Sequence, residues 1–168
     1  AYWAGRSAKE IGHEDWSVRW FTIAASHPTT FYGQHATYEL GKQPTIKDQD
    51  LNTISPGHEI AFENKKIVRS IKLLKKLRED GLVITFLTRL RLDSISAEDY
   101  ILTAELAKVV GHPNVALRTA KSARQKGILL PEILYPDLTI NHPENSNAEP
   151  ALILALIRQE SEFNHKAI

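Results

Sequence analysis

The sequence predicts an all-α protein, organised as an αα-hairpin superhelix of the right-handed helical-repeat type. Apolar residues recur at helical spacing in successive segments of about 11–16 residues. Glycine or proline stands between these segments, which is typical of helix ends. No repeat is regular enough to match a tetratricopeptide motif, so the prediction concerns the architecture and not a named repeat.

The composition is that of an ordinary soluble globular protein. The chain has 168 residues, 42% hydrophobic and 24% charged, enough for one or two small domains. Its net charge of +1 gives no overall attraction to nucleic acid or a membrane surface. No apolar run approaches the roughly 18 residues of a membrane-spanning helix. There are no cysteines, and the seven histidines lack partners at ligand spacing, so no disulfide, metal or cofactor is predicted.

The first 41 residues are expected to form three helices. Two of them cover 1–11 and 14–26, and a third, capped by Thr29 or Thr30, runs to residue 40. The apolar stripe of the second helix is expected at Trp16, Trp20, Ile23 and Ala24, which places its tryptophans in the core. Gly33 lies inside the third helix, where glycine costs about 1 kcal/mol against alanine, so a close approach of another helix is expected there.

A polar linker over 42–57 and a long basic helix, straight or kinked, over about 58–80 are expected next. The predicted buried stripe of this helix is Ile67, Ile71, Leu74 and Leu77. Its remaining surface is basic: Lys65, Lys66, Arg69, Lys72, Lys75, Lys76 and Arg78. We interpret this surface as a solvated face. The alternatives are an acidic partner, such as peptide-stem carboxylates, or a nucleic-acid backbone, but no nucleic-acid-binding motif accompanies it, so no nucleic-acid partner is predicted.

Three more helices are expected before residue 127. The first covers 82–92, with a strand as the alternative over 83–85, and Gly81 is interpreted as the end of the preceding basic helix. The second begins after Ser96 as N-cap and is stopped by Gly111, and the third covers 113–126. Two prolines then preclude a long helix over 127–136.

The last nineteen residues, 150–168, begin as a helix capped by Asn147. Residues 151–157 are apolar on every side, as in a helix buried within a larger domain. At about 100° per residue, Glu160 shares a face with Ile153, Leu156 and Ile157, whereas Arg158 and Glu162 fall opposite. Glu162 is therefore expected to face solvent. Glu160 is expected against an apolar wall that raises its pKa, which suits a general acid, although such a glutamate is more often a paired or snorkelling residue.

The string ALIRQESEFNHKAI within this segment resembles the first catalytic helix of the soluble lytic transglycosylases. The matching residues are Arg158, Gln159, Glu160, Ser161, Phe163, Asn164 and Ala167. Glu162 stands where many members carry glycine, and His165 where many carry proline. Both differences lie outside the position of the catalytic acid.

Two further motifs resemble the helical repeats upstream of the catalytic domain in the same family. The first is Tyr-Trp-x-Gly-Arg and the second is Thr-Phe-Tyr-Gly-Gln; they are matched by Tyr2, Trp3, Gly5, Arg6, Thr30, Phe31, Tyr32, Gly33 and Gln34. A Gly-…-Tyr-Pro segment precedes the catalytic domain in the family and is matched by Gly127, Tyr135 and Pro136. The motifs occur in the expected order. The resemblance is thin between 42 and 110.

The resemblance implies a division into three parts and an activity on the cell wall. Residues 1–41 would end a superhelical domain, 42–140 would form a helical linker domain, and 141–168 would begin a lysozyme-like catalytic domain. The enzymes of this family cleave the β-1,4 bond between MurNAc and GlcNAc in peptidoglycan glycan strands and release 1,6-anhydroMurNAc. Glu160 would be the catalytic residue and Ser161 would support it, without cofactor or metal, in the periplasm.

The chain starts at Ala1 without methionine or signal peptide and stops at Ile168, so we expect a fragment that is inactive by itself. The alternative is a helical-repeat scaffold that binds a protein partner and carries no chemistry. The residues encoded after Ile168 separate the two hypotheses. They are expected to continue Ser-x-x-Gly-Ala-x-Gly-Leu-Met-Gln in a transglycosylase.

Overall fold

The computed structural model describes residues 1–46, 54–136, 138–139 and 148–164. Within these ranges all regular structure is helical and no strand occurs, so the all-α prediction is confirmed. The chain divides into two compact units, Ala1–Lys47 and Asp48–Ile168, which are described separately below. No helix in the described parts is long and apolar enough to cross a membrane.

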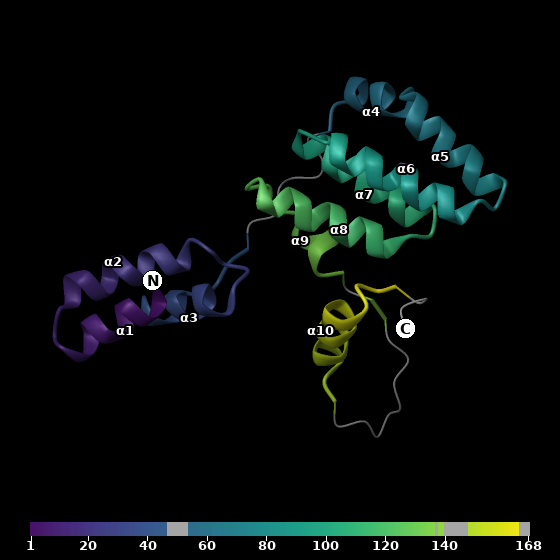
Figure 1. Cartoon of the computed structure of the whole chain (residues 1–168). Helices are drawn as coiled ribbons and strands as arrows, with labels where there is room; N and C mark the ends of the chain where they lie inside the picture. Colours follow the sequence, from purple (N-terminus) through teal and green to yellow (C-terminus); the bar gives the residue numbers. More distant parts are fainter. Residues whose placement is uncertain (47–53, 137, 140–147, 165–168) are drawn as a thin grey trace. The chain divides into compact units, whose positions relative to one another are not determined.

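The first unit consists of α1 (Tyr2–Glu10), α2 (Glu14–Ala25) and α3 (Phe31–Glu39), and consecutive helices pack side by side (Figure 1). Its core is Tyr2, Phe21, Ala24 and Ala36. The ammonium group of Lys9 donates to the carboxylate of Glu39 at 2.8 Å and so joins α1 to α3. This unit therefore has a small core that is supplemented by an ion pair at its surface.

The predicted core face of α2 is wrong in part. Trp16 and Ile23 are exposed, with 61% and 43% of their surfaces accessible, and the buried face runs through Ser17, Phe21 and Ala24 instead. The physical reason is that the ring of Phe21 on α2 approaches Gly5 of α1 closely. A Cβ atom there would lie 2.7 Å from the ring of Phe21, so the absence of a side chain lets this ring enter the core.

Gly33 does permit a close approach, but not to another helix. A Cβ atom on Gly33 would lie 2.0 Å from the carbonyl oxygen of His27, which belongs to the loop before α3. In the same turn, the hydroxyl of Thr30 accepts the backbone N–H of Gly33 at 3.1 Å and caps the helix, as predicted for Thr30. The glycine is therefore required by its own capping loop.

The second unit begins with α4 (Pro56–Glu63) and α5 (Lys66–Lys76), so the predicted basic helix is divided at Asn64 and Lys65. On α5 the buried residues are Val68 and Ile71, whereas Leu77, placed in the stripe by the sequence, is 61% exposed. Leu77 is the last residue before the turn at Arg78, whose φ of +60° ends the helix. Its side chain therefore lies beyond the buried face.

Four further helices complete the core of the second unit: α6 (Asp80–Asp93), α7 (Ala97–Val109), α8 (Pro113–Gln125) and α9 (Pro131–Leu134). Gly81 was predicted to end the preceding helix, but it lies within the first turn of α6. The segment 83–85, ambiguous between helix and strand, is helical, with Val83 buried. Positive φ angles at Gly111 and Gly127 end α7 and α8, as predicted.

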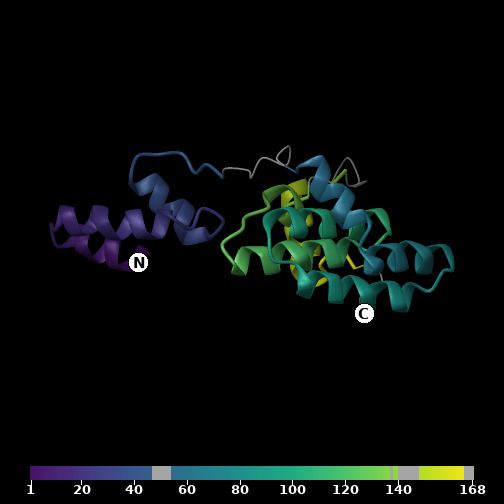
Figure 2. The same ribbon diagram turned by 90° about the horizontal axis from the view of Figure 1, so that it is seen from above.

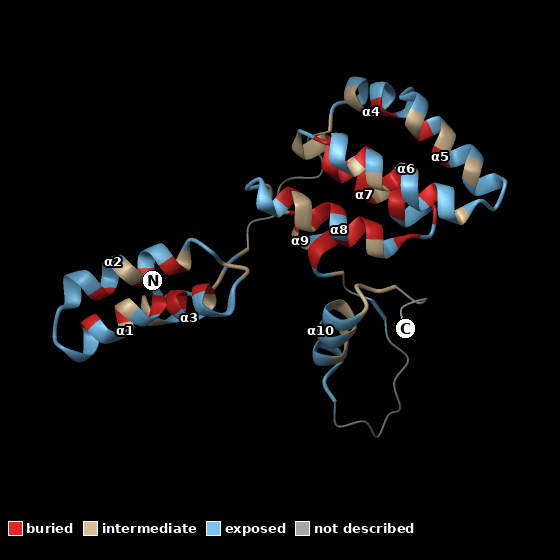
Figure 3. Cartoon of the chain, viewed as in Figure 1, coloured by how far each residue is buried: buried red, intermediate tan, exposed pale blue. Residues whose placement is uncertain are grey.

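Buried residues of α4 to α9 form one apolar core (Figure 3). Its largest fully buried side chains include Tyr100 and Phe62. Helix α7 packs along α8, and α5 along α6, an arrangement of neighbouring pairs seen in two directions in Figures 1 and 2. The boundary expected between 140 and 141 lies outside the described residues.

Candidate functional site

Helix α10 (Pro150–Glu160) carries the motif residues Arg158, Gln159 and Glu160 at its C-terminal end. The motif residues Ser161, Phe163 and Asn164 follow the helix, and Ala167 lies outside the described residues. Its N-cap is Glu149, whereas the predicted cap, Asn147, lies outside the described residues. The sequence predicts a helix buried within a larger domain, and in the described chain none of its residues is buried (Figure 3). The described chain supplies neighbours for one side of this helix only.

The side of α10 that meets the rest of the unit carries Arg158. Its Nε donates to the carbonyl oxygen of Leu134 at 2.7 Å, and its guanidinium lies 4.7 Å from the centroid of the Tyr135 ring. A pocket of about 330 Å³ lies beside these contacts, lined by Tyr135, Pro136, Ala151, Leu154, Ala155, Arg158 and Phe163. The sequence places Arg158 on the side of the helix opposite Glu160, and this side attaches α10 to α9 through Leu134.

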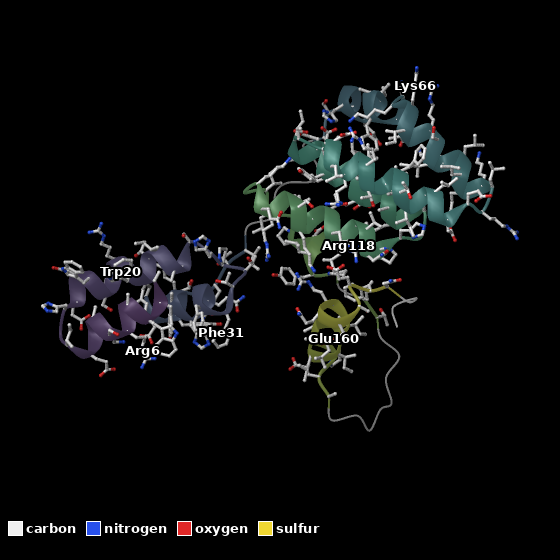
Figure 4. All side chains as sticks on the ribbon, viewed as in Figure 1. Arg6, Trp20, Phe31, Lys66, Arg118 and Glu160 are labelled. Atoms are coloured by element: carbon white, nitrogen blue, oxygen red, sulfur yellow. The ribbon has the colours of Figure 1, made fainter. Side chains whose placement is uncertain are left out.

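Glu160, labelled in Figure 4, follows Arg158 by two residues and therefore lies on the opposite side of α10 at about 100° per residue. The helix continues to Glu160, so the predicted face shared with Ile153, Leu156 and Ile157 follows from its geometry. Leu156 on this face is 54% exposed and Leu152, one turn earlier, is 55% exposed, whereas Ile153 and Ile157 are half-buried. Glu160 is exposed as well, so the apolar surroundings expected for it are not supplied by the described residues.

Glu162 was predicted to face solvent, but its carboxylate is mostly covered and ion-paired. Its carboxylate accepts hydrogen bonds from Nε of Arg118 at 2.6 Å and from the ammonium of Lys121, both on α8, and its side chain is only 21% exposed. Burial raises the pKa of this carboxyl, but the bonds from Lys121 and Arg118 outweigh burial and hold the pKa below its usual value.

The prediction failed at Glu162 because α10 ends two residues earlier. Glu162 and Phe163 have φ angles of +52° and +61°, in the left-handed region, so the chain turns back toward α8. A helical wheel cannot be continued through such a turn. The partners Arg118 and Lys121 lie more than forty residues away in the sequence, and no local signal indicates them.

Ser161, the second predicted site residue, follows Glu160 directly. Its hydroxyl donates to the carbonyl oxygen of Ile157 at 3.0 Å, and its carbonyl accepts the N–H of Asn164 at 2.8 Å. The side chain is half-buried and stabilises the last turn of α10. The local chemistry at this helix end is thus an exposed carboxyl group next to a hydroxyl already used within the helix. No group of three or more histidine, aspartate or glutamate side chains that could hold a metal occurs in the described ranges.

Residues from separate motifs meet in each unit. In the second unit, Arg158 of the catalytic-helix motif contacts the ring of Tyr135 from the Tyr-Pro motif. In the first unit, the rings of Tyr2 and Tyr32 stack with centroids 5.2 Å apart, and Trp3 meets Tyr32 at 6.0 Å. Comparisons with protein-family models, curated proteins and solved structures find no match for this chain.

Proposed function

We propose that this chain is part of a soluble lytic transglycosylase that acts on peptidoglycan glycan strands in the periplasm. In this proposal the chain comprises the end of a right-handed helical superhelix, a helical linker, and the first helix of a lysozyme-like catalytic domain. Packing of consecutive helices in both units agrees with such an array. The motif residues and their order support the assignment to this family.

One observation about α10 carries the proposal. The helix is attached to the rest of the second unit by the side that bears Arg158. Its other side exposes Leu152, Leu156 and Glu160 to solvent. Large exposed apolar side chains beside a carboxyl group are typical of a surface that packs against another domain. A catalytic domain packed on this side would place Glu160 at its inner wall, where loss of hydration raises a carboxyl pKa.

The proposed reaction uses the Glu160 carboxyl group twice. First it donates its proton to the oxygen of the glycosidic bond between MurNAc and GlcNAc, and that bond breaks. The carboxylate then takes the proton of the C6 hydroxyl as this oxygen bonds to C1 of the same sugar, which gives the 1,6-anhydro ring and consumes no water. The N-acetyl group stabilises the positive centre, so the second carboxylate of ordinary glycosidases is not needed.

The test is release of anhydro-muropeptides from purified peptidoglycan by the longer protein that contains this chain. Glu160→Gln keeps the size of the side chain and removes the acid, so we expect a rate at least about a hundredfold lower, equivalent to roughly 3 kcal/mol of transition-state stabilisation. Glu105→Gln is a matched control, because Glu105 is 45% exposed and pairs with Lys108 in its own helix. The control is expected to keep full activity.

Near-normal release by the Glu160→Gln protein would show that the acid has been assigned to the wrong residue. No anhydro product from the unaltered longer protein would remove the proposal altogether. Circular dichroism of each variant checks that the helices are intact.

A scaffold function is the second candidate, and exposed aromatic side chains in the first unit favour it. Trp3 and Phe31 are 62% and 68% exposed, as expected for residues that bind a protein partner. A scaffold would bind that partner equally well with Glu160→Gln, whereas Trp3→Ala would weaken binding. The two functions are therefore distinguished by which substitution removes activity.

A further inference from the structure

The backbone on both sides of Glu160 is attached to the rest of the second unit. Arg158, two residues before it, bonds to the backbone of Leu134. Glu162, two residues after it, bonds to Arg118 and Lys121. Phe163 packs against the core of the second unit. The backbone that carries Glu160 is therefore held at two ends while its side chain is exposed.

The bond network at Glu162 differs from an ordinary surface ion pair. One carboxylate receives charge-assisted hydrogen bonds from two cations of α8, and its side chain is mostly covered. It also joins segments that are separated by more than forty residues, whereas the pairs Arg89–Asp93 and Lys108–Glu105 lie within single helices. Breaking it would free the end of α10 from α8.

The backbone at Glu162 and Phe163 gives an independent reason for assigning a role to this network. Both residues are in the left-handed region, which non-glycine side chains rarely adopt. Such conformations persist where surrounding contacts over-determine them. Here those contacts are the bonds from Arg118 and Lys121 and the packing of Phe163.

We propose that Glu162 is a positioning residue for Glu160, because its bonds to Arg118 and Lys121 fix the end of α10 on α8. This inference rests on the proposed function, in which Glu160 is the acid. A displacement of about 1 Å in a catalytic group costs up to about a hundredfold in rate. Glu162 would act through the backbone and would not itself touch the substrate.

The first experiment measures the attachment and does not depend on the function. Amide hydrogen exchange of residues 150–163 is followed in this chain and in its Glu162→Gln, Arg118→Gln and doubly substituted variants. We expect exchange about five- to thirtyfold faster in each single variant, because loss of the attachment lowers the local stability of α10. The double variant should show no further increase. Glu105→Gln, which removes a carboxylate paired within its own helix, should leave α10 unchanged. Unchanged exchange with Glu162→Gln overturns the inference.

The second experiment measures positioning in the longer protein through anhydro-muropeptide release. Glu162→Gln and Arg118→Gln should each lower kcat by about ten- to a hundredfold with KM unchanged. Arg118→Lys keeps the positive charge and should restore most of kcat, which a loss of folding would not allow. An unchanged kcat with Glu162→Gln overturns the positioning role.

The two experiments also separate the inference from the function on which it rests. Where the unaltered protein gives no anhydro product but exchange accelerates as expected, the proposed function and with it the positioning role fail, while the attachment of α10 to α8 stands. Where product forms and only Glu162→Gln is without effect, the proposed function stands and the inference fails.

Discussion

Glu160 and Glu162 lie two residues apart, yet their carboxylates have different surroundings because α10 ends between them. Glu160 is the last residue of the helix and is exposed. Glu162 adopts a left-handed backbone and reaches Arg118 and Lys121. Glycine adopts that backbone conformation without strain, and glycine is what many transglycosylases of the resembled family carry at this position. In this chain the left-handed conformation occurs at a residue whose side chain is held by ion pairs with Arg118 and Lys121.

Asp99 is a further carboxylate whose charge contributes to the fold. Its side chain is 11% exposed and accepts a hydrogen bond from Lys65 at 2.7 Å, and Nε2 of His58 lies 3.5 Å away. Burial raises the pKa of Asp99, but the hydrogen bond and charge of Lys65, with smaller contributions from the backbone of Ile95 and from His58, lower it below the ordinary value of 3.8. A carboxyl with a lowered pKa stabilises the folded state only while it is ionised.

Asp99→Asn should therefore lower the free energy of unfolding of this chain by roughly 1–2 kcal/mol at pH 7. The difference from the unaltered chain should be fully present above about pH 4 and disappear as the pH falls through the lowered pKa of Asp99. Urea denaturation between pH 2 and pH 7 measures it. Asp93→Asn is the control, because Asp93 is exposed and pairs with Arg89 in its own helix. An equal loss at every pH would assign the effect to packing and not to charge.

Helix α5 shows how one element divides its charges between paired and solvated positions. Lys72 pairs with Glu63, and Lys75 lies 3.1 Å from Asp80. Lys66, Arg69 and Lys76 are exposed and have no ion pair with any residue in the described ranges. The basic surface therefore includes two lysines that connect α5 to its neighbours as well as a solvated face.

Reversing the solvated charges of α5 should leave folding nearly intact. The variant Lys66→Glu, Arg69→Glu, Lys76→Glu is expected to stay within about 0.5 kcal/mol of the unaltered chain, because exposed charges away from partners contribute little. Lys72→Glu with Lys75→Glu should lower the free energy of unfolding by roughly 1 kcal/mol or more, since the new carboxylates would lie beside Glu63 and Asp80. Chemical denaturation measures both variants. In the longer protein, abolished binding to peptidoglycan by the first variant would show that this face binds an acidic ligand and is not merely solvated.

At the scale of the whole chain, each unit has a helical core of its own. The pocket lined by residues of α10 lies on the side of Arg158, and a second pocket nearby is lined by α8, α9 and Phe163. Glycan cleavage needs a cleft at the acid and groups that stabilise developing charge. Glu160 is exposed, and it does not line either of the pockets described at this end of the unit. The proposed activity thus requires further residues around Glu160.

The chain of 168 residues is accordingly expected to release no anhydro-muropeptides from peptidoglycan. Its far-ultraviolet circular dichroism should show a helical spectrum without a substantial strand contribution, which verifies that the inactive chain is folded. Mass spectrometry of the soluble products measures the release. Detectable anhydro product from this chain alone would show that Glu160 needs no covering domain, and it would contradict the proposed arrangement.

The ends of the helices follow from the sequence because they depend on local chemistry. Thr30 and Ser96 cap α3 and α7 through bonds to N–H groups three residues away, and Gly111 takes a positive φ that other residues resist. The two faces of α10 also follow from spacing alone. The sequence therefore predicted the fold class and most helix boundaries of this protein.

The tertiary structure decided which faces those helices bury and which carboxylate finds partners. Phe21 enters the core in place of Trp16 because Gly5, on another helix, leaves room for its ring. Arg158 is held by Leu134 and Tyr135, and Glu162 by Arg118 and Lys121. All of these partners are distant in the sequence. Periodicity identifies the sides of a helix, but the environment of each side depends on the neighbours that folding brings to it.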